Sequence, residues 1–173
     1  EDFTLVTFPE NQYISYLDYF LWNMTSEELA MGSNKTFGPA GAEDDEDFFG
    51  PRYISLDPAQ DSINFISPLS YYDYDSNMIK ATQVKYIDVA DARIFPDQEL
   101  LIVKPDARLK TLQKAKIIAN RTTKFHTLYN GIITINGRNS YYGSAEYDYY
   151  DELDQKQVIH FKSVQAEPGE YTV

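Results

Sequence analysis

The sequence predicts an all-β fold from its aromatic content, the length of its apolar runs and the alternation of its side chains. Aromatic residues make up 15% of the chain, with 15 Tyr and 10 Phe, and Tyr favours the half-buried surface of a sheet over a helix interior. From residue 63 to residue 164, short apolar runs alternate with turn residues, a spacing typical of strands. We therefore expect stacked short strands and hairpins, as a β-solenoid, a jelly-roll-like fold or a meander. At most one or two short helices are expected, with helix below roughly 15% of residues.

The composition favours a single globular domain over residues 1–173 and excludes several functions. The formal net charge is -12, so nucleic acid and anionic bilayers would be repelled. With no cysteine, the chain has no disulfide framework, thiol nucleophile or thiolate metal site, which is compatible with the cytosol or with a bacterial periplasm or surface. No run of 18 apolar residues occurs, so we expect no transmembrane helix.

The first third of the chain contains one ambiguous segment and one loop. In residues 13–24, Tyr13, Leu17 and Phe20 fall at helical spacing, but the aromatic density favours strand. Residues 32–51 combine Gly and Pro with the acidic run 43–47, which predicts an acidic surface loop. The run lacks the alternating spacing of a calcium loop, so we expect a solvated segment, with residues 38–50 the most mobile internal part of the chain.

An internal similarity links residues 22–32 with residues 72–82. Both segments carry an aromatic residue, then Asn or Asp, then Ser and an aliphatic residue. Such Asx and Ser side chains bond to their own backbone and turn one strand into the next. This predicts a strand–turn–strand repeat, with a looser third copy starting at Tyr150.

The strongest local prediction is a hairpin near the C-terminus. Residues 141–150 alternate with period two, residues 151–155 form the turn, and residues 156–164 return as a strand. We expect Ile159 and Phe161 to be buried on one face of the return strand, with Val158, His160 and Val164 on the other. Upstream, residues 132–135 are expected to form a strand that ends in a tight turn at residues 136–137. Residues 109–116 are the other possible helix.

Few residues point to chemistry. Neither His126 nor His160 lies in a metal-ligand spacing, and no serine-hydrolase elbow or phosphate-binding loop occurs. We therefore expect no catalytic residue, metal or cofactor. A glycosidase-type acid pair stays a less favoured alternative; its candidates lie at strand ends, namely Asp73, Asp75, Asp148, Asp151 and Glu152.

A row of tyrosines is the candidate ligand-binding site. Tyr141, Tyr147 and Tyr149 fall on one face of the predicted strand. Tyr offers large contact area with little entropy to lose, so these rings suit a sugar or a partner protein. The alternative is that the same face packs inward.

Two resemblances extend these observations. Residues 68–87 resemble one rung of the OstA-like fold of lipopolysaccharide-transport proteins, although Gln83 stands where that family usually has Gly. Residues 87–97, 119–126 and 143–149 are similar to segments of large uncharacterised exported β-rich proteins of Bacteroidota. The second resemblance implies a fragment or subunit of a larger envelope assembly, exported to the periplasm, outer membrane or cell surface of a Gram-negative bacterium. It also makes Ser62, within Asp61-Ser62-Ile63, an O-glycosylation candidate.

We therefore expect a non-enzymatic structural or binding module of a bacterial cell-envelope or surface protein. Its expected partners are other envelope proteins or further domains of the same large protein, with lipid or glycan as further candidates. One alternative is an OstA-like lipid-transport conduit. A carbohydrate-active enzyme with paired carboxylates is less favoured.

Overall fold

The computed structural model describes residues 4–33, 50–120, 126–166, 169 and 172. Strands account for 62% of the described residues and helical turns for 4%, so the predicted all-β fold is confirmed. The described helical elements are two 3₁₀ turns of three residues, η1 (Pro58–Gln60) and η2 (Asp97–Glu99).

The described strands form three open antiparallel sheets. Sheet A has the order β1-β2-β5-β6, sheet B the order β11-β8-β7-β4-β3, and sheet C the order β15-β14-β13-β12-β10-β9. Sheet A contains β1 (Thr4–Phe8), β2 (Tyr13–Leu17), β5 (Arg52–Ser55) and β6 (Asn64–Ile66). Sheet B contains β3 (Tyr19–Asn23), β4 (Glu28–Gly32), β7 (Leu69–Asp73), β8 (Met78–Thr82) and β11 (Leu101–Val103). Sheet C contains β9 (Ile87–Val89), β10 (Ala92–Phe95), β12 (Leu112–Ala119), β13 (His126–Gly137), β14 (Ser140–Tyr150) and β15 (Lys156–Ala166).

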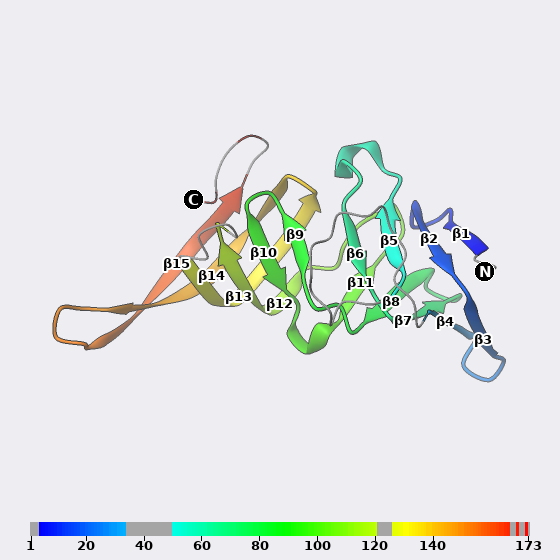
Figure 1. The fold of residues 1–173 in the computed structure, drawn as a ribbon, viewed down its shortest axis with the longest axis horizontal. Coiled ribbons are helices and arrows are strands. Elements are labelled where there is room, and N and C mark those ends of the chain that lie inside the picture. Colours follow the sequence, from blue (N-terminus) through cyan, green and yellow to red (C-terminus); the bar gives the residue numbers. More distant parts are fainter. Residues whose placement is uncertain (1–3, 34–49, 121–125, 167–168, 170–171, 173) are drawn as a thin grey trace.

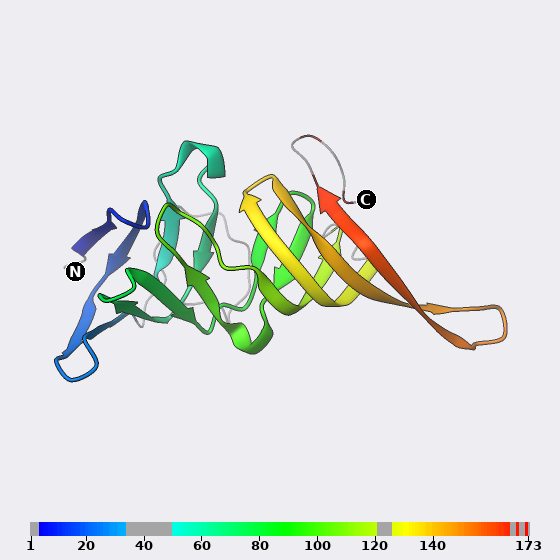
Figure 2. The ribbon, with the colours of Figure 1, turned by 180° about the vertical axis from the view of Figure 1, so that it is seen from behind.

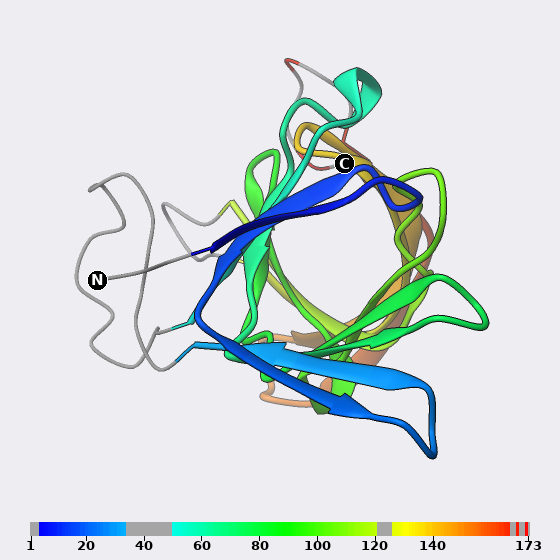
Figure 3. The same cartoon turned by 90° about the vertical axis from the view of Figure 1, so that its right-hand side faces the viewer.

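The molecule is elongated, and its two ends differ. Strands β1 to β4 lie at one end, and the β14–β15 hairpin projects from the other (Figure 1). The view from behind shows the same hairpin extending past the rest of sheet C (Figure 2). Seen end-on, the strands surround a common interior (Figure 3).

Large side chains fill this interior. Fully buried residues include Tyr13, Tyr53 and Tyr141 together with Leu17, Met31, Ile63, Ile79, Ile87, Ile94, Leu101, Ile117 and Ile133. Tyr53 stacks on Phe65 with ring centroids 5.3 Å apart. The Tyr13 hydroxyl donates to Gln60 Oε1 at 3.1 Å, and Gln60 Nε2 donates to the carbonyl of Ala107 at 2.6 Å. The buried polar atoms of this group are therefore paired, as an apolar interior requires.

Residues 13–24 form β2 and β3, so the strand prediction is confirmed. The possible helix at residues 109–116 is wrong, because most of this segment belongs to β12. The pairing register of β12 with β13 shifts between Leu112 and Ala115, and Lys114 has a φ of 53°. A β-bulge at this point buries Leu112 and Ala115, which lie three positions apart. This spacing also occurs on one face of a helix.

The acidic loop lies largely outside the described residues. Strand β4 ends at Gly32 and β5 begins at Arg52, while residues 34–49 are not described. The acidic run and the mobility of residues 38–50 therefore stay predictions.

The C-terminal three-stranded unit is confirmed, but its first turn lies two residues later than predicted. Gly137 pairs with Ser140, so Arg138 and Asn139 form the turn. Gly137 instead allows a close approach, because a Cβ there would lie 2.9 Å from the Cα of Gln60 in η1.

The face assignment of the return strand is wrong. Phe161 and Ile159 are each 39% exposed, whereas Val164 is buried. Gly143 pairs with Val164 and Ala145 with Phe161, so β15 carries an extra residue between these pairs. This bulge rotates Val164 onto the buried face. Ile159 and Phe161 keep the predicted phase, but they lie on the projecting part of the hairpin, beyond the buried core.

Candidate interaction surface

The three tyrosines of the predicted binding row have different environments. Tyr141 is fully buried, its hydroxyl shares a 2.9 Å hydrogen bond with Thr172 Oγ1, and burial raises its pKa to about 12. Tyr147 is half-buried, with its ring 5.7 Å from that of His126 and 6.4 Å from that of Phe161. Tyr149 is exposed. Tyr141 is therefore a core residue, and only the two outer tyrosines remain accessible.

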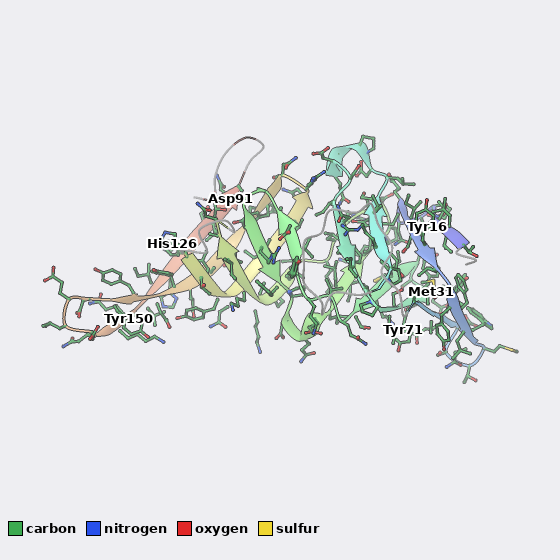
Figure 4. All side chains as sticks on the ribbon, viewed as in Figure 1. Tyr16, Met31, Tyr71, Asp91, His126 and Tyr150 are labelled. Carbon is green, nitrogen blue, oxygen red and sulfur yellow. The ribbon has the colours of Figure 1, made fainter. Side chains whose placement is uncertain are left out.

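The candidate carboxylates lie at opposite ends of the molecule. Asp73 and Asp75 belong to the β7–β8 hairpin, close to Tyr71, whereas Asp148 lies in β14 and Asp151 and Glu152 follow that strand near Tyr150 (Figure 4). Asp73 Oδ1 accepts from the backbone amides of Asp75 and Ser76. The fold thus does not bring the two groups together. The Oδ1 atom of Asp73 serves the turn, and its Oδ2 atom lies 3.4 Å from Lys80 Nζ.

In the projecting hairpin, the carboxylates form polar pairs across strands. Asp148 accepts a hydrogen bond from the Tyr129 hydroxyl and lies 2.6 Å from Lys156 Nζ. The Lys156 hydrogen bond, followed by that of Tyr129, lowers the pKa of Asp148. His160 Nδ1 lies 3.1 Å from Glu146 Oε1 on the same surface. These contacts join β13, β14 and β15.

Ser62 and His126 lie at the surface turn after η1 and at the start of β13. Ser62 is exposed in the turn after η1, with a φ of 54°, so its surroundings leave room for a modification. His126 begins β13. Within the described part of the chain, no three His, Asp or Glu residues form a group able to hold a metal ion.

The most unusual surface is strand β3, which the sequence analysis did not single out. It is the last strand of sheet B, and among the described residues only β4 pairs with it. All five of its residues are exposed, although the first four are Tyr19, Phe20, Leu21 and Trp22. Large contiguous apolar surface of this kind marks interaction sites in soluble proteins.

The sheet register shows why this exposure matters. Trp22 pairs with Leu29, which pairs with Tyr72, which pairs with Ile79. Paired residues share one face of a sheet, and Tyr72 and Ile79 are buried on that face. Phe20 and Trp22 therefore continue the core face of sheet B, yet they are 43% and 45% exposed. Strand β3 overhangs the core.

One overhanging aromatic side chain, Trp22, contacts the neighbouring β7–β8 turn. The ring of Tyr74 lies 4.8 Å from that of Tyr72 and meets it edge to face. Trp22 also meets the Tyr74 ring edge to face. The overhang is thus continuous with the buried aromatic residues.

The β3–β4 and β7–β8 turns use the same hydrogen bonds. Asn23 Oδ1 accepts from the amides of Thr25 and Ser26, as Asp73 Oδ1 does from Asp75 and Ser76. Glu27 and Asn77 each have positive φ at the fourth position after the Asx residue. The shared pattern of residues 22–32 and 72–82 thus corresponds to a shared turn. A wider repeat stays a prediction.

A second apolar surface lies on the projecting β14–β15 hairpin. Its exposed large side chains are Tyr149, Tyr150, Leu153, Val158, Ile159 and Phe161. This edge differs from β3, because Lys156 and Lys162 and the bulge before Val164 interrupt it. Charges and bulges of this kind discourage pairing with another strand.

One signal in the sequence could have revealed β3. Residues 19–22 are four consecutive large apolar residues, whereas a half-buried strand alternates apolar with polar. A strand that is apolar on both faces must be covered on both faces. Within the described part of the chain, neither face of β3 is fully covered.

Comparison of the chain with family models, curated proteins and solved structures finds no match. Within the described residues, no helix is long and apolar enough to cross a membrane. The exposed sheet edges are accordingly the feature of this molecule that points to a function.

Proposed function

We propose that the chain is a non-enzymatic structural or binding module of a bacterial cell-envelope or surface protein. It joins its neighbours through its sheet edges. The observation that carries the proposal is β3, an edge strand whose apolar residues continue the core face of sheet B into solvent. Exposure of this apolar surface to water is unfavourable in free energy, and a partner that covers the surface removes that penalty.

The shape of the molecule supports a connecting role. Apolar strands are exposed at both ends of an elongated body, on β3 and on the β14–β15 hairpin (Figures 1 and 2). The partners we propose are other envelope proteins or further domains of the same large protein. The proposed location is the periplasm, outer membrane or cell surface.

The interior favours this role over an OstA-like lipid conduit. A conduit needs an open apolar groove for acyl chains, whereas Tyr53, Met31 and Ile79 are fully buried among other core residues. Lipid transport is therefore the less favoured alternative. The crosslinking experiment below distinguishes it from binding to a polypeptide.

Site-specific photocrosslinking in the producing cell tests the proposal. A benzophenone amino acid replaces Phe20 on β3 or, as the control, Tyr142. Tyr142 is similarly exposed, but its strand is paired on both sides. We expect the Phe20 position alone to crosslink to a polypeptide that mass spectrometry identifies as an envelope protein or a neighbouring domain. Equal crosslinking at both positions, or adducts of lipid alone, would overturn the proposal.

A further inference from the structure

We infer that β3 accepts one extended strand of a partner polypeptide in which large apolar residues alternate with Lys or Arg. This inference rests on the proposed binding function and names the chemistry of the partner. Addition of a strand to an open sheet edge takes affinity from main-chain hydrogen bonds and specificity from alternate side chains.

Among the described edges of five or more residues, β3 is the one that exposes apolar side chains on both faces and carries no charge, Pro or bulge. Edge strands normally avoid pairing by being short or by carrying charges, Pro or bulges. The edges β6, β9 and β11 have three residues each, and β15 carries lysines and a bulge. The five-residue edge β1 also lacks charge, Pro and bulge, but Phe8 is buried and Val6 packs against the core, so one face of β1 is covered. Residues 19–22 of β3 contain no charge and no Pro.

The core face of β3 requires apolar residues in the partner. Phe20 and Trp22 lie on the face that is buried in the neighbouring strands. A strand added beside β3 presents every second side chain on that face. Apolar side chains at these positions extend the core of sheet B over Phe20 and Trp22.

The opposite face favours basic residues in the partner. Residues 18–33 and 69–82 contain five carboxylates and one lysine. Glu28 and Asp73 lie on the same face as Leu21 and share Lys80, whose Nζ is 2.7 Å from Glu28 and 3.4 Å from Asp73. The acidic surplus attracts Lys or Arg at the outward positions. It also repels a second copy of this chain, whose formal charge is -12.

Peptide binding tests the inference. The probe is a fluorescein-labelled, blocked peptide of about six residues, an ordinary strand length, in which Lys alternates with Val and Tyr. The matched peptide has Glu at every Lys. By fluorescence anisotropy at low salt, we expect the Lys peptide to bind at least about tenfold more tightly, and this difference to shrink at high salt.

Variants of Leu21 test whether the peptide binds at β3. This side chain is 57% exposed, so its replacement leaves the core intact, which circular dichroism checks. We expect Leu21→Lys to weaken binding of the Lys peptide about tenfold through like-charge repulsion, and Leu21→Glu to leave it as tight or tighter. The control Leu56→Lys, at an exposed position of another segment, has no effect on Lys-peptide binding beyond its long-range charge.

Three peptide-binding results would each overturn the inference: equal binding of the Glu peptide, no effect of Leu21→Lys, or no binding of the Lys peptide. Dimerisation of the unmodified chain in sedimentation, abolished by Leu21→Lys, would also overturn it by making a second copy the occupant. The proposed function fails separately. If Phe20 crosslinks to an envelope polypeptide but the peptide results are negative, only the partner chemistry is wrong. If the Lys peptide binds but Phe20 forms no crosslink in cells, the proposed function is wrong.

Discussion

Trp22 meets Tyr74 edge to face, with ring centroids 4.9 Å apart and an angle of 83° between the planes. Trp22 belongs to the edge strand β3, whereas Tyr74 belongs to the turn between β7 and β8. The contact therefore links two hairpins and fixes the orientation of a side chain that remains nearly half exposed. A fixed aromatic surface loses little conformational entropy when a partner binds it.

Because Trp22 lies beyond the core, its truncation should cost little stability. We predict that Trp22→Ala lowers the free energy of unfolding by about 1–2 kcal/mol, from the lost ring contact and partial burial. Met31→Ala, on the same sheet face but fully buried, should cost about 2–5 kcal/mol. Urea denaturation measures both. Equal losses would place Trp22 in the core and remove the basis for a binding edge.

Because the two hairpins share the same turn, Asp73→Ala and Asp73→Asn should differ in their effect on stability. Asp73→Ala removes the acceptor for the amides of Asp75 and Ser76 and should destabilise the chain by about 1 kcal/mol. Asp73→Asn should recover most of this loss, because Asn23 makes the equivalent bonds in the other hairpin. If urea denaturation showed that Asn is as harmful as Ala, the carboxylate charge rather than the turn geometry would be what matters.

Because the projecting hairpin is exposed, truncation of Phe161 should cost little stability. We predict that Phe161→Ala costs about 1 kcal/mol, since the side chain is only partly buried. Ile133→Ala, at a fully buried position of β13 in the same sheet, should cost about 2–5 kcal/mol. Thermal or urea unfolding of the two variants compares them directly. A loss above about 3 kcal/mol at Phe161, the value for a buried Phe, would restore the sequence-based assignment.

The Asp148 network predicts a pH dependence of known sign. The Lys156 cation lowers the pKa of Asp148, so its contribution to stability is present above the unfolded-state pKa and is lost as the pH falls through the folded-state pKa. We predict that an NMR titration of the unmodified chain shows this depressed pKa. Lys156→Met should raise it towards the ordinary range, and Tyr129→Phe should raise it less. The reverse order would make Tyr129 the main partner.

Alternation made the C-terminal hairpin predictable. Residues 141–150 keep period two without interruption, so strand, turn and return strand follow from the sequence. The bulges were not predictable in this way. The extra residues near Lys114 and before Val164 each move later side chains to the other face. The residue types at these two bulges give no sequence signal of the change.

The candidate site was harder to predict because it depends on what surrounds a strand. The apolar pattern of residues 19–22 indicates burial on both faces, and only the sheet order shows that β3 has one paired neighbour. Likewise, the period that groups Tyr141 with Tyr147 and Tyr149 is correct, but burial changes along β14 as the hairpin leaves the core. Position along a strand, and not phase alone, decides which residues are available for binding.

Backbone amide hydrogen exchange of residues 19–23 tests the central claim most directly. It compares the isolated chain with the chain bound to the polypeptide that crosslinks at Phe20. We predict that amides of β3 directed away from β4 exchange rapidly in the isolated chain and become protected in the complex, because an added strand bonds to them. Unchanged exchange in β3, with new protection elsewhere, would contradict the claim that this open sheet edge is the binding surface.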